Sequence, residues 1–495
     1  MSRLVRIALT AMALFLILPA AARAQGSIAG VVKDTSGAVL PGVTVEASSS
    51  ALIEKVRSVT TDGNGAFRIE NLRPGEYTVT FTLPGFATVK REDIQLTGEF
   101  VATVNADMRV GGVEETITVS GEAPLIDVQS ATRQSVVDRE ILDVLPSAGG
   151  NLSNVAALIP GINAAAVDVG GLSGVGRGAS VSAHGVTNMQ QQFNGLSLSA
   201  ANGGASGAVT NMGAYQEISI DTGGGGAENR EGGVRLQFIP RDGGNTFNGT
   251  MFAHFANHSM QGDNYSQALK DAGLRAPSTL KRMWELNPGF GGPIKKDRLW
   301  FYASYRYYMN ALSPPGAVFN LNANKPNVWA YAPGAPDRQP SNDSTFKDFT
   351  ARLTWQASQR NKIALTWTEQ PQCFCLETIA ALVAPDASVR RAYTIRNVIV
   401  DWQSPLTSRV LLEAAAIPLR YQKVTRRLSE FSNPAMVSVV DQALGGLVYR
   451  APQGTNNAPS PFRDTEYLTS FYRAVTSYIT GAHAFKVGFN FGTLA

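Results

Sequence analysis

The second half of the chain contains segments in which apolar and polar side chains alternate, and the clearest covers residues 298–309. One face of that segment carries Leu299, Phe301, Ala303, Tyr305, Tyr307 and Met309, and the other carries Trp300, Tyr302, Ser304, Arg306 and Tyr308. A period of two predicts a β-strand with one apolar face. Such a strand suits a wall between lipid and water, although soluble β-sandwiches use the same alternation.

The connections between these segments separate the two interpretations. Nine candidate strands follow Asn245, over residues 249–258, 283–294, 298–309, 346–356, 362–369, 392–402, 409–419, 467–478 and 484–491. Long connections (259–282, 310–345, 370–391 and 420–466) alternate with short ones (295–297, 357–361, 403–408 and 479–483). Outer-membrane barrels have short periplasmic turns and long outer loops, an asymmetry that a soluble sandwich has no reason to keep. We therefore expect an antiparallel membrane wall over residues 243–495, with Cys373 and Cys375 in an outer loop.

The first 24 residues have the pattern of a secretory signal peptide. Arg3 and Arg6 precede the apolar run 7–18, and Ala22-Arg23-Ala24 supplies a cleavage site with small residues. Twelve apolar residues are too few to span a bilayer as a helix. The chain is therefore expected to be secreted across the inner membrane.

Residues 25–109 predict a small β-sandwich. Seven short extended runs lie at residues 28–33, 43–47, 56–61, 66–69, 77–83, 88–95 and 101–108. Turn signals rich in Gly, Pro, Asp and Asn separate them, including Pro41-Gly42 and Asp62-Gly63-Asn64-Gly65. Short strands at regular spacing with turns between them are typical of a sandwich.

Residues 110–121 form a linker that contains a short β-prone run. Its residues are Glu115, Thr116, Ile117, Thr118 and Val119. Such a run can add as an edge strand to the sheet of a partner protein, with backbone hydrogen bonds supplying affinity. An ordinary linker strand remains the alternative, because β-propensity over five residues is weak evidence.

Residues 122–242 mix short helices, strands and glycine-rich tracts. A helix is expected at residues 139–144 and strands at 215–221 and 234–239. A junction with the wall follows, for which the candidate residues are Glu228, Arg230, Gly232 and Gly233. Glu228 and Arg230 could form a charge-assisted pair, and a solvated pair of little energetic value is the alternative.

Composition excludes several classes of function. Loss of Arg3, Arg6 and Arg23 with the signal peptide lowers the net charge from +4 to +1, so we expect no nucleic-acid partner. The four histidines form no HExxH or HxxE pattern, and two cysteines cannot make a four-cysteine metal site. We therefore expect no enzymatic activity, no cofactor and no metal site.

Two family resemblances add to these expectations. The stretches GSIAGVVKDTSGAVLPGVTV, TTDGNGAFRIENLRPGEYTV and LPGF resemble the carboxypeptidase regulatory-like domain, which has a carbohydrate-binding-like fold. In order along the chain, EETITVSG, LPSAGGNLSNVAALIPGI, AENREGGVRLQFIPRDGGNTFNGTMF and GFGGPIKKDRLWFYASYRYY resemble the Oar-like branch of the TonB-dependent outer-membrane receptors. The resemblance implies that Glu115 to Val119 is a TonB box, that residues 122–242 are the plug, and that residues 243–495 are the N-terminal part of the barrel.

The expected fold is mainly β, with an N-terminal β-sandwich, an α/β plug domain and a partial outer-membrane antiparallel β-barrel. Receptors of this family close with about 22 strands, so nine candidate strands lead us to expect a C-terminally truncated chain. The expected function is uptake of an unidentified substrate across the cell outer membrane. The expected partners are a TonB-type energy-transducing protein, outer-membrane lipid, and a carbohydrate or peptide as candidate substrate. The alternative function is that of a cell-surface carbohydrate-binding or adhesion protein.

Overall fold

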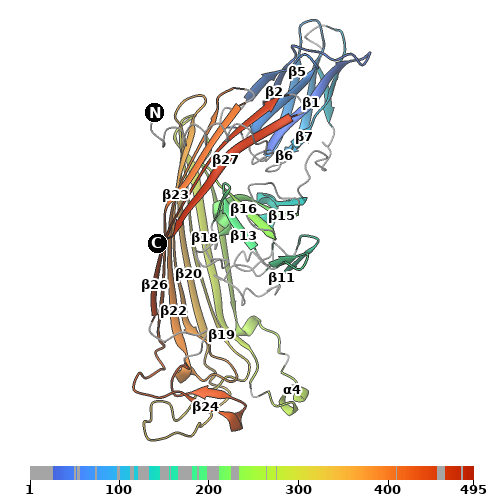
Figure 1. Cartoon of the computed structure of the whole chain (residues 1–495). Helices are drawn as coiled ribbons and strands as arrows, with labels where there is room; N and C mark the ends of the chain where they lie inside the picture. The colour runs from blue at the N-terminus through green and yellow to red at the C-terminus, as the bar shows by residue number, and fades with distance from the viewer. Residues whose placement is uncertain are drawn as a thin grey trace, which may run out of the picture.

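The fold is that of a computed structural model of the chain. It describes residues 26–49, 52, 56–72, 75–96, 101–111, 116–120, 133–144, 155, 158–164, 181–186, 189–197, 211–223, 233–263, 265–274, 276–407, 410–453, 463–480 and 483–494. The structure has three parts, which we call the sandwich, the central unit and the wall. Figure 1 shows the sandwich beyond one end of the wall and the central unit against the concave face of the wall.

The sandwich consists of two sheets. One contains β1 (Gly26–Asp34), with which β4 (Ala66–Leu72), β7 (Val101–Thr103) and β8 (Ala106–Met108) all pair. The other has the order β3 (Val56–Thr60), β2 (Thr44–Ser48), β5 (Gly75–Thr82), β6 (Thr88–Leu96) and β9 (Thr116–Ser120). Alternate residues of both sheets point inward and form one core, in which Phe67 and Phe81 meet edge to face.

The run expected at residues 101–108 is divided into β7 and β8. The chain approaches β1 closely between them, where the Val104 amide donates to the Ala29 carbonyl at 2.8 Å. A Cβ atom on Gly30 would lie 1.9 Å from the Val104 carbonyl oxygen. Only glycine fits at that position, and the close approach separates the two short strands.

The central unit contains a five-stranded mixed sheet. Its order is β10 (Arg133–Val137), β15 (Tyr215–Gly223), β16 (Val234–Pro240), β13 (Met189–Phe193) and β14 (Leu196–Ser197). A short helix, α2 (Arg139–Val144), and a 3-10 turn, η2 (Met212–Ala214), flank it, and β11 (Ile162–Ala164) pairs with β12 (Val181–Ala183). The strands β15 and β16 are buried along most of their length, and their burial includes polar side chains such as Glu217, Asp221 and Arg235.

The wall is a nine-stranded antiparallel sheet in which the strands follow chain order. Its strands are β17 (Asn248–Asn257), β18 (Thr279–Lys295), β19 (Leu299–Ser313), β20 (Asn342–Gln356), β21 (Lys362–Glu377), β22 (Val389–Pro405), β23 (Val410–Leu428), β26 (Arg463–Thr480) and β27 (His483–Leu494). The expected fold class is confirmed, since the chain is mainly β and these strands form one large sheet that is not closed.

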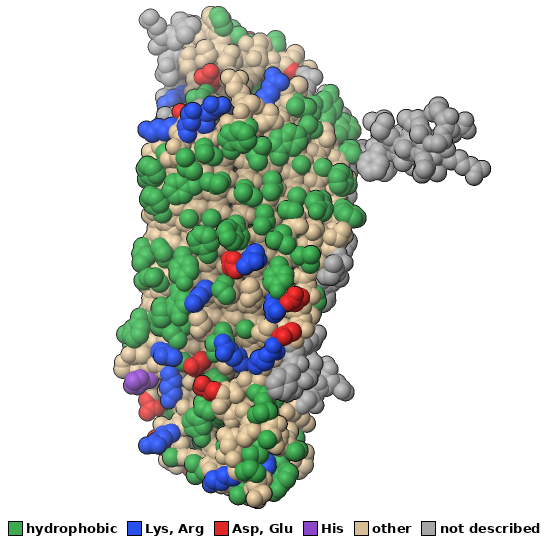
Figure 2. Space-filling view, turned by 90° about the vertical axis from the view of Figure 1, so that its left-hand side faces the viewer, with side chains coloured by type: hydrophobic (Ala, Val, Ile, Leu, Met, Phe, Trp, Pro, Cys, Tyr) green, Lys and Arg blue, Asp and Glu red, His purple; other side chains and the backbone are tan. Residues whose placement is uncertain are grey.

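The two faces of the wall differ as the alternation predicts. In β20, Phe349, Leu353 and Trp355 are exposed, whereas Thr350 and Arg352 are buried toward the central unit. Figure 2 shows apolar side chains in a band across the convex face, with charged side chains gathered beyond the band at both ends. This distribution is typical of a sheet with lipid on its outer side.

The long connections contain local structure of their own. Their short elements are η3 (His258–Met260), α4 (Gln267–Asp271), η4 (Pro385–Ala387), β24 (Val439–Asp441), η5 (Gln442–Leu444) and β25 (Leu447–Tyr449). Asp386 joins three of these connections, because its Oδ2 accepts from the Asn320 amide group at 3.0 Å and from the Arg450 backbone N–H at 2.9 Å. The α4 and β24 elements lie at the end of the wall far from the sandwich (Figure 1).

Several wall strands are longer than the sequence pattern predicts. The strand β23 continues to Leu428, where Lys423 pairs with Glu466 at 2.6 Å and Arg427 with Asp464 at 2.7 Å on β26. Both faces are polar in this extension, so no alternation marks it in the sequence. The placement of Cys373 and Cys375 in a loop is wrong: both lie on β21, joined to each other by a disulfide. Backbone pairing with β20 and β22 extends β21 past the alternating segment, as at Cys373, which pairs with Thr345 and Ala392.

None of the helices in the described ranges is long and apolar enough to cross a membrane.

Candidate functional site

The candidate partner-binding run lies at the edge of the sandwich. Thr116 to Val119 belong to β9, which pairs in parallel with β6 from Thr88↔Thr116 to Glu92↔Ser120. Glu115 lies outside the described residues. The run is therefore an extended strand, as the sequence predicts, but tertiary pairing adds it to the sandwich sheet.

The candidate junction residues are only partly visible. Glu228, Arg230 and Gly232 lie outside the described residues, whereas Gly233 directly precedes β16 with φ of 110°. That backbone conformation strongly favours glycine, which accounts for the residue at this position. Whether Glu228 and Arg230 form a charge-assisted pair or a solvated pair of little energetic value stays a prediction.

The contacts that hold the central unit on the wall come from other residues. Asn211, at the N-terminal end of η2, donates from Nδ2 to Ser304 Oγ and to Asp348 Oδ1, both at 3.1 Å. Its Oδ1 accepts from the Gly213 amide at 3.0 Å and from Asn287 Nδ2 at 3.1 Å. One side chain thus joins the turn of the central unit to three strands of the wall.

Asp348 is itself surrounded by donors. In addition to Asn211, Gln370 Nε2 donates to its Oδ2 at 2.6 Å and Thr350 Oγ1 donates to its Oδ1 at 3.0 Å. Asp348 and Thr350 are buried, so these hydrogen bonds replace water that the carboxylate would otherwise contact. On the facing side, burial and then the nearby Asp348 charge raise the pKa of the Tyr215 hydroxyl well above its usual range, so Tyr215 stays neutral.

A second polar cluster lies where the chain enters the wall. Arg352 donates from Nε to Asp242 Oδ1 at 2.6 Å and from its terminal nitrogens to both oxygens of Asp401, at 2.9 and 3.2 Å. Thr354 Oγ1 and Lys362 Nζ reach Asp242 at 2.6 and 3.2 Å. The side chain of Arg352 is 5% exposed, so these ion pairs are shielded from water.

Glycine permits the close approach at this entry point. A Cβ atom on Gly243 would lie 2.2 Å from the Phe301 carbonyl oxygen, whereas one on Gly244 would meet nothing closer than 3.9 Å. Next to them, Asn245 Oδ1 accepts from the Trp300 indole N–H at 2.8 Å and from the Asp297 amide at 2.9 Å. The GGN sequence therefore holds the entry segment against β19, just before β17, which itself pairs with β18.

The seat of the central unit, as we call the Asn211–Asp348 and Asp242–Arg352 clusters together, was not identified among the candidate residues. Its wall members lie on the polar faces of strands in which polar and apolar residues alternate. At such positions the sequence indicates only that a polar side chain is needed. The available signal was charge: Arg352 and Asp401 are ionisable residues on strands that otherwise have membrane character, and such residues usually have a function.

No group of three or more His, Cys, Asp and Glu side chains suited to a metal ion occurs among the described residues. On the polar face of β18 and β19, Glu285 accepts from Arg306 at 2.7 and 3.1 Å. The pair is buried, and His254 Nδ1 lies 3.9 Å from the same carboxylate. This arrangement forms an ion pair within the wall.

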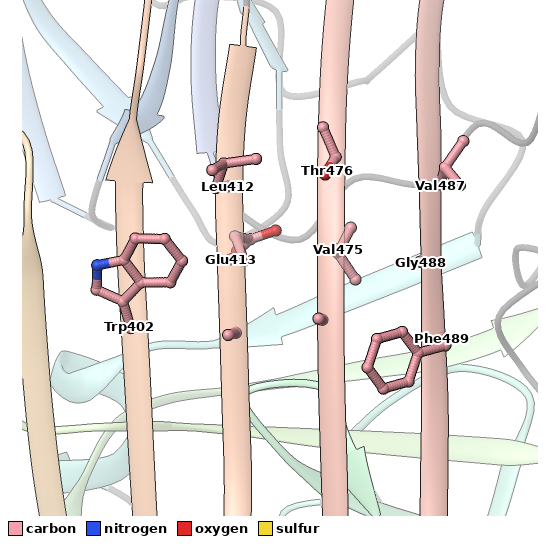
Figure 3. A pocket seen from close by; sticks show the side chains of 10 residues that line it. Trp402, Leu412, Glu413, Val475, Thr476, Val487, Gly488 and Phe489 are labelled. Carbon is pink, nitrogen blue, oxygen red and sulfur yellow. The ribbon is translucent and has the colours of Figure 1, made fainter. Parts of the chain in front are cut away.

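An apolar depression on the convex face is drawn in Figure 3. Trp402, Ala414, Ala474 and Phe489 are register neighbours across β22, β23, β26 and β27. Two small side chains between two large ones leave the hollow. It lies on the apolar face, away from the seat.

Comparisons with known proteins agree with the sequence patterns. The family model described as carboxypeptidase regulatory-like domain matches residues 27–109. The TonB-dependent transporter Oar of Myxococcus xanthus is 28% identical over 377 residues, which cover 72% of this chain and 34% of that protein. The chain thus spans about a third of the length of this curated relative.

Several solved structures align with the chain. The siderophore receptor PirA of Acinetobacter baumannii aligns with a TM-score of 0.44 and 14% identity, over 70% of this chain and 45% of the receptor. The outer membrane transporter YddB of Escherichia coli gives 0.48 and 11%, over 70% and 46%. The ferric yersiniabactin uptake receptor FyuA of Yersinia pestis gives 0.45 and 10%, over 71% and 46%.

The resemblance stated from the sequence is confirmed: the chain is homologous to a TonB-dependent transporter and carries a carboxypeptidase regulatory-like domain. The expected location in the outer membrane is confirmed by the same homology. A surface adhesin is not favoured, and the similar proteins reported above are transporters and receptors.

Proposed function

We propose that this chain forms the sandwich, plug and first wall strands of a TonB-dependent outer-membrane transporter that takes up an unidentified substrate. The proposal divides the chain into residues 25–109, 110–121, 122–242 and 243–495. The observation that carries it is the central unit seated by polar groups on the concave face of a wall whose convex face is apolar.

The seat explains how a plug can be both stable and movable. Hydrogen bonds and ion pairs contribute to holding it, and water can replace such contacts when the plug shifts. Each neutral hydrogen bond then contributes only about 0.5–1.5 kcal/mol net, and each bond to a charged group about 1.5–3 kcal/mol. Part of the contact is apolar, because Ile399, Ala415 and Ile417 of the wall belong to the same buried cluster as the core of the central unit. Displacement would expose that part to water, which opposes it. The polar seat therefore suits a unit that is displaced and returns, and the apolar part favours its return.

Energy would come from a partner that binds N-terminal to the plug. In chain order, Thr116 to Val119 come after β8 of the sandwich and before β10 of the central unit, so a pull on them would be transmitted along the chain to the plug. A TonB-type protein is the proposed partner, with outer-membrane lipid around the convex face and a carbohydrate or a peptide as the candidate substrate class. No catalytic role is proposed.

Fractionation and cross-linking together test the proposal. Expressed in a Gram-negative host, the chain should stay in the outer-membrane pellet after urea or alkaline extraction, because its apolar face is in contact with lipid. A cross-linker placed beside Thr116 should capture the TonB-type protein of the host. Release by urea would favour the adhesin, and membrane retention without capture would remove the dependence on TonB.

A further inference from the structure

The strand β9 is fixed to the sandwich by more than its own ladder. Before β9 begins, the Ala87 amide donates to the Arg109 carbonyl at 2.8 Å, and the Gly111 amide donates to the Gly85 carbonyl at 3.2 Å. Phe86 and Val110 form an isolated antiparallel bridge in the same place. The linker is therefore aligned along the start of β6 before the parallel pairing with Thr88 begins.

The topology supports the same placement. Between β6 and β9 the chain crosses to the opposite sheet, where β7 and β8 pair with β1 in parallel. It then returns to β6, as parallel pairing of β9 requires. The strand thus completes the sandwich sheet and does not hang from it as a free tail.

One edge of β9 has no strand partner among the described residues, since the order of the sheet ends β5-β6-β9. In any strand, successive residues direct their N–H and C=O groups to opposite sides. Alternate residues of β9 therefore bond to β6, and the remaining ones present a donor and an acceptor at the open edge. This is the arrangement to which an added strand binds.

We propose that the sandwich presents β9 as a preformed docking edge, and that a strand of the TonB-type partner extends the sheet β3-β2-β5-β6-β9 at that edge while β9 stays on β6. This rests on the proposed function. The sandwich then acts as a scaffold for energy coupling. Ordering a free five-residue segment costs about 1–2 kcal/mol of backbone entropy per residue. Because β9 is already ordered in the folded sandwich, partner binding does not include this cost.

In the opposite arrangement, β9 binds the partner only after it has separated from β6. Separation breaks the whole β6–β9 ladder, whereas addition at the open edge breaks no hydrogen bond. A covalent lock between β6 and β9 distinguishes the two. Lys90 and Thr118 are register neighbours, and Lys90 lies on the solvent side of β6, opposite the buried Val89.

The test uses the full chain in detergent micelles and the purified periplasmic domain of a TonB-type protein of the host. The variant combines Lys90→Cys with Thr118→Cys, and its control combines Thr80→Cys with Lys90→Cys, which joins β5 to β6 away from β9. We expect the oxidised lock to keep the dissociation constant within about threefold of its reduced form, as does the control. A loss of about tenfold or more in the oxidised lock alone, reversed by reduction, would overturn the scaffold.

A second measurement reads the edge itself. Hydrogen exchange resolved to single residues should show alternate amides of β9 protected in the free chain and the remaining ones protected only with the partner domain bound. Uniformly fast exchange in the free chain would contradict the preformed strand. If the partner domain binds neither the unmodified chain nor the lock, the dependence on TonB fails; if it binds equally well to Ile117→Pro, the docking edge fails while the transporter proposal stands.

Discussion

Two adjacent glycines at the entry to the wall, Gly243 and Gly244, meet very different surroundings. The first lies against the backbone of β19, and the second faces open space. Whether a Cβ atom fits at each position depends on how close the Phe301 carbonyl oxygen lies, which the local sequence does not reveal. At this scale the tertiary contact decides which of two identical residues is essential.

We therefore predict that Gly243→Ala destabilises the wall by about 1–3 kcal/mol, because a Cβ atom there would overlap the Phe301 carbonyl. Gly244→Ala is the matched control and should leave stability unchanged. Guanidinium unfolding followed by tryptophan fluorescence measures both. Equal midpoints for the two variants would contradict the close approach.

Arg352 provides a second test among single residues. Replacement by Met should cost about 3–5 kcal/mol, because it leaves the buried Asp242 and Asp401 carboxylates without their shared cation. Arg396→Met is the control, since its pair with Glu369 is exposed and water weakens it. Unfolding midpoints give the comparison. Similar losses of stability for both variants would show that the buried Arg352 cluster contributes no more than an exposed ion pair.

Among the elements, β9 combines a local signal with a tertiary role. Its β-prone run is readable in the sequence, but its pairing with β6 is not, because parallel partners are chosen by long-range topology. The wall strands show the reverse: their apolar and polar faces are local, and only their outer extensions depend on neighbours.

Proline substitutions in β9 should abolish capture of the TonB-type protein. Ile117→Pro or Val119→Pro fixes φ and removes a backbone donor, so the ladder that carries affinity cannot form. Thr116→Ala keeps the backbone intact and should cost little. Cross-linking in intact cells measures capture, and wild-type yields for both proline variants would reduce β9 to an ordinary linker strand.

The turn after β1 should make the sandwich sensitive to acid. The Ser36 hydroxyl, with the Ala38 amide, lowers the pKa of Asp34 below its usual 3.8. A lowered pKa means that the ionised carboxylate stabilises the fold above pH 3.8 and loses that effect as pH falls through the lower folded value. Asp34→Asn should flatten this part of the pH profile of the melting temperature; an unchanged profile would show that the turn makes no such contribution.

At the scale of the whole molecule, the sandwich has its own closed core, in which Ile28, Phe67 and Phe81 are buried and share no cluster with the central unit. We predict that residues 26–108 fold alone and melt cooperatively, as independent domains do. Circular dichroism of that fragment tests this, with Phe81→Ala as a variant expected to lose about 3–5 kcal/mol. A broad thermal transition without a folded baseline would contradict independent folding of this fragment.

The sequence by itself indicated the nine wall strands, their two faces and the order of the three parts. Alternation at 298–309 places Phe301 and Arg306 on opposite faces, and turn residues such as Pro41-Gly42 mark the sandwich, because side-chain direction and turn conformation are set over a few residues. The tertiary structure alone decided which polar groups meet. Asn211 lies 137 residues from Asp348, and Arg352 lies 110 from Asp242, so neither pair leaves a local pattern. Burial away from water selects such partners only after the central unit lies on the wall, since each buried charge then requires a donor or a counter-charge within reach.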